Sequence, residues 1–206
     1  VMTQLPYTED FESYEVSIPH KIDEGVKFSY PPLAWAKARF GWEVREVDGN
    51  KVLAKTMDRL ILQRGLTFIG HPKERNYTFQ TDVMTDGSRR LSSDVGIINQ
   101  RYIIKLRGNY QQLVVECNQE RLNVSTKFKF DRKKWYTLKS RIDVNEDGSG
   151  KVLAKVWERG TDEPEAWTIQ VPVAHAHTHG APGLFGFAIN GKYRVYVDNI
   201  KITPNQ

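Results

Sequence analysis

Cysteine is nearly absent from this sequence: Cys117 is the only one among 206 residues. A single cysteine cannot form an internal disulfide, so the fold depends on its core, and a chain of this length can bury a sizeable one. Cys117 follows Leu113-Val-Val-Glu on the apolar side of an expected strand. We therefore interpret it as a buried, inert thiol, which does not determine the cellular compartment.

Long apolar runs are missing as well. No stretch approaches the ~20 residues of a membrane-spanning helix, so we expect no membrane span. The start, Val1-Met-Thr-Gln-Leu-Pro6, lacks the basic and apolar regions of a signal peptide, and we interpret the chain as a mature or excised domain. No phosphate loop or dinucleotide fingerprint occurs, so no nucleotide or redox cofactor is expected.

Positive charge is only mildly in excess, with a formal net charge of +5. The basic residues are scattered, apart from small clusters at Arg89-Arg90 and Arg132-Lys-Lys134. Solvated strand faces and turns account for these clusters, and a site for a polyanion is the alternative. No basic helix or RNA-recognition signature is present, so we expect no nucleic-acid partner.

What the sequence does contain is alternation of apolar and polar residues, the period of half-buried strands. It is clearest over Tyr77–Val83, Tyr102–Arg107, Leu122–Phe130 and Tyr136–Val144. Turn signals lie between such segments, at Asp48-Gly49, Asp86-Gly87, Gly108-Asn109, Asp147-Gly148 and Asn190-Gly191. Many short strands predict a single β-sandwich or barrel over residues 1–206, with at most one helical turn around Met57 to Leu62.

The C-terminal segment from Gly183 to Pro204 carries two further expected strands. Asn190-Gly191 lies between them and predicts a hairpin. Asp198-Asn199 interrupts the alternation of the last strand, which suggests a bulge or a site.

Several motifs together resemble a known fold family. They are Leu5-Pro-Tyr-Thr-Glu-Asp-Phe-Glu12, Gly41-Trp-Glu-Val44, Asp94-Val-Gly96, Val156-Trp-Glu-Arg-Gly160, Pro182-Gly-Leu-Phe-Gly186 and Val197-Asp-Asn-Ile-Lys-Ile-Thr-Pro204. They resemble a laminin-G-like, concanavalin A-like jelly roll of the kind found at the C-terminus of bacterial proteins with PQQ-like β-propeller repeats. The chain is more distantly similar to carbohydrate-binding modules, family 16 glucanases and the 3-keto-disaccharide hydrolase family.

The resemblance implies an all-β antiparallel sandwich whose first and last strands pair. It also implies export to the periplasm, outer membrane or exterior, and a neighbouring domain as a partner. Family 16 glucanases carry Glu-x-Asp-x-x-Glu on one strand, and no such run occurs here. We therefore predict a non-catalytic accessory domain that binds carbohydrate or cell-surface glycan. A hydrolase of the 3-keto-disaccharide type and a structural module packing on a β-propeller remain alternatives.

The predicted ligand face rests on alternation within strands. In Lys151–Trp157, the side chains of Lys155 and Trp157 oppose the apolar face, so Trp157 is the candidate platform for a sugar ring. Lys105, Arg107 and Arg141 also point away from the apolar side, and we place all five on one concave sheet. The alternative is that Trp157 packs on Trp167 in the interior.

Metal sites are suggested at three places. The resemblance implies a structural calcium held by Asp198 and Glu12, against the alternative that Asp198 and Asn199 only cap the last strand. Asp143-Val-Asn-Glu-Asp-Gly148 matches half of a calcium loop, but a hairpin turn explains it better.

The third suggestion is the run His175-Ala-His-Thr-His179. In an extended chain, its three imidazoles would project to one side and could hold zinc, copper or nickel. A solvated loop between Pro172 and Gly180 is the alternative interpretation.

Overall fold

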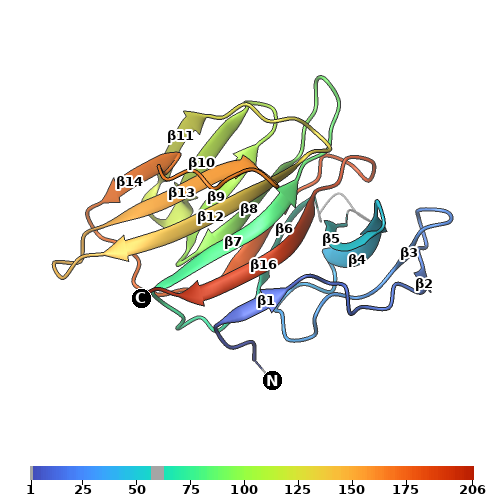
Figure 1. Ribbon diagram of the computed structural model, residues 1–206, viewed down its shortest axis with the longest axis horizontal. Coiled ribbons are helices and arrows are strands. Elements are labelled where there is room, and N and C mark those ends of the chain that lie inside the picture. The colour runs from blue at the N-terminus through green and yellow to red at the C-terminus, as the bar shows by residue number, and fades with distance from the viewer. Residues whose placement is uncertain (1, 57–62) are drawn as a thin grey trace.

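The computed structural model describes residues 2–56 and 63–206. The single helical turn expected at 57–62 lies outside the described residues. Two antiparallel sheets face each other across one core, and a small ribbon lies beside them (Figure 1). This confirms the all-β antiparallel sandwich. In the described residues, no helix has the length and apolar character needed to cross a membrane.

The larger sheet has eight strands. In spatial order they are β14 (Ile169–Val173), β13 (Gly150–Glu158), β12 (Trp135–Val144), β7 (Tyr77–Met84), β16 (Tyr196–Pro204), β5 (Asn50–Lys55) and β4 (Trp42–Val47), with β1 (Tyr7–Glu9) also paired to β16. The six-stranded sheet has the order β11 (Leu122–Lys127), β10 (Gln112–Cys117), β9 (Tyr102–Arg107), β8 (Asp94–Asn99), β15 (Gly183–Phe187) and β6 (Arg64–Phe68). The ribbon is β2 (Ile18–Pro19) with β3 (Lys27–Phe28).

The inward faces of both sheets follow the alternation seen in the sequence. Tyr77, Phe79 and Val83 of β7 are fully buried, as are Ile104 and Leu106 of β9. Burying one large apolar side chain stabilises the fold by about 1.5–3 kcal/mol. The residues that alternate with these inward positions, such as Thr78 and Gln80 of β7, face outward, and on the eight-stranded sheet such residues line the site described below.

The first and last strands pair, as the resemblance implied, with Tyr7 opposite Ile202. The polar pair in β16 forms the expected bulge, because its register with β7 shifts between Asp198 and Lys201. Asn199 has a φ of 49°, a left-handed conformation that asparagine tolerates better than most residues.

Two of the turn signals close tight hairpins. Asp48 and Gly49 join β4 to β5 with φ values of 52° and 82°, as a type I′ turn requires. Asp147-Gly148 lies in the turn between β12 and β13, where the Asp147 carboxylate accepts a hydrogen bond from the Ser149 amide at 2.9 Å. Residues 143–148 thus form the hairpin that the sequence favoured over a calcium loop.

The hairpin predicted at Asn190-Gly191 is wrong. Strands β15 and β16 belong to different sheets, and the turn lies on the connection between them. The Asn190 side chain accepts hydrogen bonds from the amides of Lys192 and Tyr193 at 3.0 and 2.9 Å, which forms a local turn without strand pairing. The dipeptide reverses the chain, but β15 and β16 cover opposite sides of the core, and each pairs with strands of its own sheet.

Candidate functional site

A groove lies on the outer face of the eight-stranded sheet. Its first cavity has a volume of about 390 Å³. The lining side chains are Thr78 and Gln80 from β7, Lys139 and Arg141 from β12, Lys155 from β13, Lys201 and Thr203 from β16, and Glu165 and Trp167 from the loop before β14. A second cavity shares Thr78, Arg141, Lys201 and Thr203 and continues the groove to Asp143 and the C-terminal residues.

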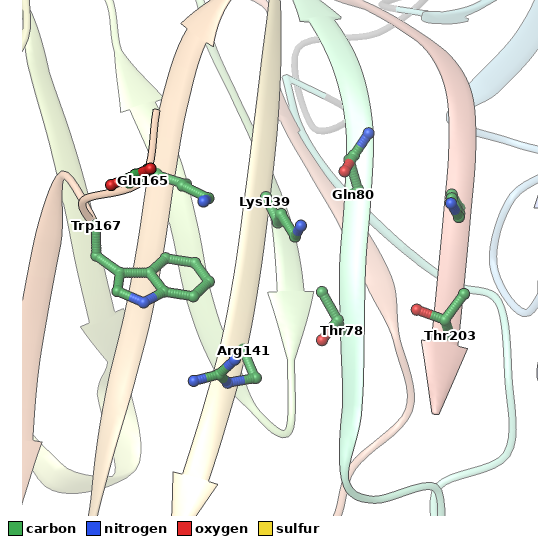
Figure 2. A pocket seen from close by; sticks show the side chains of 9 residues that line it. Thr78, Gln80, Lys139, Arg141, Glu165, Trp167 and Thr203 are labelled. Carbon is green, nitrogen blue, oxygen red and sulfur yellow. The ribbon is translucent and has the colours of Figure 1, made fainter. Parts of the chain in front are cut away.

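Alternation within β12 explains why charged side chains reach this face. Leu138 and Ile142 are buried in the core, so Lys139 and Arg141 must project from the opposite side of the strand. The same period in β7 buries Phe79 and turns Gln80 outward. Figure 2 shows Lys139, Arg141, Gln80 and Thr78 projecting from neighbouring strands toward the viewer's side of the sheet.

The loop between β13 and β14 forms one wall of the groove. The Lys155 ammonium group holds this loop by donating to the Pro164 carbonyl at 2.7 Å and pairing with Glu163 at 3.2 Å. Lys139 also contacts Glu163, at 2.9 Å. Burial opposes ionisation of Glu163, but the hydrogen bonds from both lysines outweigh it and hold its pKa below the ordinary value. The loop is therefore anchored over the sheet.

Trp167 is the aromatic residue that this loop brings to the groove. Its ring lies 5.3 Å from the Arg141 guanidinium and 4.9 Å from the Lys155 ammonium group. These are favourable cation–π distances, so the two cations help to position the half-buried ring. Figure 2 shows the indole extending from the loop across β13 toward Arg141.

Basic side chains outnumber carboxylates in the lining of the groove. Lys139, Arg141, Lys155 and Lys201 line the first cavity together with one carboxylate, Glu165, but Glu163 pairs with Lys139 and Lys155. Arg141 is paired with Asp143 at 2.8 Å, in the second cavity. Lys201 is exposed and, within the described chain, has no ion-pair partner. The arrangement favours a ligand that carries negative charge.

The structure brings together only part of the predicted ligand face. Arg141 and Lys155 line the groove, whereas Trp157 lies on the same face of β13 outside both cavities. No ring contact joins Trp157 to Trp167 within the described residues. Trp167, which the sequence suggested only as a packing partner, is the aromatic residue of the groove.

Lys105 and Arg107 lie on β9 of the six-stranded sheet, so the prediction of one shared face is wrong for them. Their head groups lie 2.9 and 3.9 Å from Glu116. Alternation shows whether a side chain points in or out, but it does not show which sheet a strand joins. Lys139 and Lys201 carried the same outward-facing signal and were missed.

The predicted calcium ligands lie near the first and last strands. Asp198 is buried, and its carboxylate accepts a hydrogen bond from the Asn199 amide at 2.8 Å. The Asn199 side chain donates to Asp82 at 2.8 Å and contacts Asp198 at 3.4 Å. Glu12 instead accepts a hydrogen bond from the Lys51 amide at 3.0 Å. Calcium at Asp198 and Glu12 stays a prediction, to which the structure adds Asp82 as a nearby carboxylate.

The histidine run does not form the extended strand that would align three imidazoles. It lies in the loop 174–182, where His175 and His179 are exposed and His177 is half-buried. Only His177 joins a cluster of possible metal ligands in the described chain, together with Cys117 and Glu120.

A second basic surface lies around a cavity of about 650 Å³. The two basic clusters of the sequence meet here, because Arg89, Arg90 and Arg132 line it together with Lys127 and Lys129. Among the described residues that line it, Asp131 is the one carboxylate. More than forty positions separate these clusters in the sequence, and the fold brings them together in one patch.

No protein-family model and no curated protein sequence matches the chain. Solved structures do match over nearly its whole length. A PL-14 alginate lyase from Aplysia kurodai aligns with a TM-score of 0.58 and 10% identity, over 98% of this chain and 100% of the lyase. The transglycosylase Crh5 aligns at 0.55 and 12% identity, over 97% and 84%. A variant of alginate lyase Aly36B, in complex with alginate tetrasaccharide, aligns at 0.53 and 8%, over 97% and 96%.

These similarities establish the fold. The chain is a β-sandwich of the concanavalin A-like jelly-roll type, as its motifs predicted, and carbohydrate-active enzymes share this architecture.

Proposed function

We propose that this protein binds an acidic polysaccharide, such as a uronate polymer, in the groove on the eight-stranded sheet and does not cleave it. The observation that carries the proposal is the composition of the groove. Four basic side chains, one carboxylate and one indole ring line it together with neutral hydrogen-bonding groups, and one of these cations, Lys201, has no ion-pair partner within the described chain. The alginate lyases among the structural neighbours support a glycan of this class.

Each kind of side chain matches one feature of a uronate chain. Lys201, which has no ion-pair partner within the described chain, attracts sugar carboxylates. Lys139 and Arg141 add positive charge nearby, although Glu163 and Asp143 already pair with them. Thr78, Gln80 and Thr203 offer hydrogen bonds to hydroxyl groups. Trp167 offers the apolar face of an indole to a sugar ring.

The proposal that the protein does not cleave the glycan rests on the acids and bases that line the groove. Hydrolysis of a glycosidic bond needs two carboxyl groups on opposite sides of the bond. In the described groove, Glu165 lines the first cavity, and Asp143 is engaged by Arg141 in the second cavity. Among the described residues, no histidine or tyrosine lines either cavity. Attachment to a β-propeller protein and export remain predictions from the resemblance.

Affinity electrophoresis tests the proposal directly. We expect migration to be slowed in gels that contain alginate or polygalacturonate, but not in gels with a neutral β-glucan, and less slowed at high salt. Trp167→Ala and Lys201→Ala should each weaken retention. Trp157→Ala is the matched control, because this tryptophan lies on the same strand face outside the groove. Circular dichroism spectra establish that each variant is folded.

Other outcomes would favour a different site or a different function. Retention that is lost in Arg90→Ala but kept in Lys201→Ala would move the site to the second basic cavity. Loss with Trp157→Ala would restore that residue as the platform. Retention on no acidic glycan would favour the structural module. Release of reducing ends or unsaturated uronates during long incubation would favour the enzyme.

A further inference from the structure

Three metal-ligating side chains meet at the edge of the sandwich, away from the groove. Cys117 ends β10, Glu120 lies in the short 3₁₀ turn Asn118–Glu120, and His177 comes from the loop between β14 and β15. His177 Nε2 lies 3.5 Å from Cys117 Sγ and 2.7 Å from Glu120 Oε1. The three ligand atoms all lie within 4.8 Å of one another.

His177 is held in this position by β9 and by the turn between β8 and β9. Its ring packs against Tyr102 with centroids 5.2 Å apart. Its backbone amide donates to the Tyr102 hydroxyl at 3.2 Å, and its carbonyl accepts from the Gln100 side chain at 2.8 Å. The exposed neighbours His175 and His179 have no part in the cluster. The imidazole is therefore preorganised toward the thiol and the carboxylate.

The geometry distinguishes a metal site from a nucleophilic triad. In a cysteine–histidine–carboxylate relay, the thiol and the carboxylate contact different ring nitrogens. Here both contact Nε2, and within the described residues His177 Nδ1 takes part in no hydrogen bond or ion pair. Three donors that converge on one point can instead share a cation.

We propose that Cys117, Glu120 and His177 bind a zinc ion. A thiolate, an imidazole and a carboxylate are all ligands that zinc accepts, and the thiolate disfavours calcium and magnesium. With Zn–S near ~2.3 Å and Zn–N near ~2.0 Å, tetrahedral geometry separates S and N by roughly 3.5 Å. The observed Sγ–Nε2 distance of 3.5 Å matches this separation.

Glu120, the third ligand, must move slightly to reach tetrahedral geometry. Tetrahedral zinc separates its nitrogen and oxygen ligands by roughly 3.3 Å, which is more than the present 2.7 Å between Nε2 and Oε1. Glu120 lies in an exposed turn, with its side chain 31% accessible, so it can move outward. The same exposure leaves room for water as a fourth ligand.

Such an ion would fasten the two sheets together. Cys117 and Glu120 border β11, the edge strand of the six-stranded sheet, and the loop of His177 follows β14, the edge strand of the larger sheet. Within the described residues, no strand of one sheet pairs with a strand of the other at this edge, so a shared ion would add to the hydrogen bonds of His177 that already join the two sides.

Zinc titration by calorimetry, together with cobalt substitution, tests the proposal on the whole chain. We expect one zinc per chain, a higher melting temperature with zinc, and a sulfur-to-cobalt charge-transfer band. Cys117→Ser, Glu120→Gln and His177→Gln should each weaken zinc binding at least tenfold. The double variant His175→Gln/His179→Gln is the control, and it should bind zinc as the unmodified chain does.

Three results would overturn the proposal. They are a cobalt complex without the thiolate band, unchanged affinity in Glu120→Gln, and loss of binding in the histidine control. If Cys117→Ser fails to fold, thiol modification of the native chain replaces it. Zinc should then slow the reaction of Cys117 with a disulfide reagent, and an unchanged rate would contradict the site.

Discussion

The buried carboxyl group of Asp198 provides a quantitative test of the closing strand. Asp198 is 5% exposed and lies close to Asp82, with the Asn199 side chain between them. Burial, followed by the like charge of Asp82, raises the pKa of Asp198 from 3.8 to about 7, although the hydrogen bond from the Asn199 amide opposes this rise. The folded state thus binds this proton more tightly than the unfolded chain does.

The sign of the pH dependence follows from this difference. The favourable contribution is complete below about pH 4, where both states are protonated, and it is lost as the pH rises through about 7. The slope is about 1.4 kcal/mol per pH unit, so the free energy of unfolding falls by at most roughly 4 kcal/mol. Because Arg159 beside Asp82 is 35% accessible, water screens the cluster, and we expect about 2 kcal/mol.

Asp198→Asn removes the titration and keeps an oxygen that can accept from the Asn199 amide. In excess chelator, we expect the free energy of unfolding of the variant to exceed that of the parent by about 2 kcal/mol at pH 8 and to differ little from it at pH 4. Urea denaturation at both pH values measures this. Asp147→Asn is the control: hydrogen bonds from Ser149 lower the pKa of that exposed carboxyl, so its substitution should not stabilise the fold.

A variant that is less stable than the parent at pH 8 in chelator would refute the reasoning. Calcium changes the expectation, because a bound cation favours the ionised carboxyl. If added calcium raises the melting temperature of the parent but not that of Asp198→Asn, the calcium site implied by the resemblance is present. If chelator and Asp198→Ala both leave the melting temperature unchanged, that site is absent.

Three further predictions concern stability and binding. Although burial opposes ionisation, Arg45 and Arg194 hold the pKa of Asp23 below its ordinary value. Asp23→Asn should therefore lower the free energy of unfolding, measured by urea denaturation at pH 7, by about 2–3 kcal/mol, and by less in acid, where Asp23 of the parent is protonated. Lys201→Ala should reduce the salt dependence of retention in alginate gels, and an unchanged dependence would contradict a role for this cation. Thermal unfolding should show one cooperative transition, whereas two separate transitions would contradict a single domain.

Alternation along the strands is enough to tell which side chains face the core. Phe79 and Leu138 are buried while their neighbours Gln80 and Lys139 face outward, because side chains alternate along any extended strand. The bulge at Asp198-Asn199 was likewise visible, since a polar pair interrupts that alternation. These are properties of the local backbone, and no knowledge of distant residues is needed to infer them.

Which strands share a sheet became clear from the three-dimensional fold alone. Lys105 and Lys155 both point outward, but their strands join opposite sheets, and the Asn190-Gly191 turn connects two sheets rather than two paired strands. Likewise, His177 meets Cys117 although sixty positions separate them, and the loop before β14 carries Trp167 to the groove. Strand pairing and loop placement depend on hydrogen bonds and burial between distant segments, which a period of two along one strand does not encode.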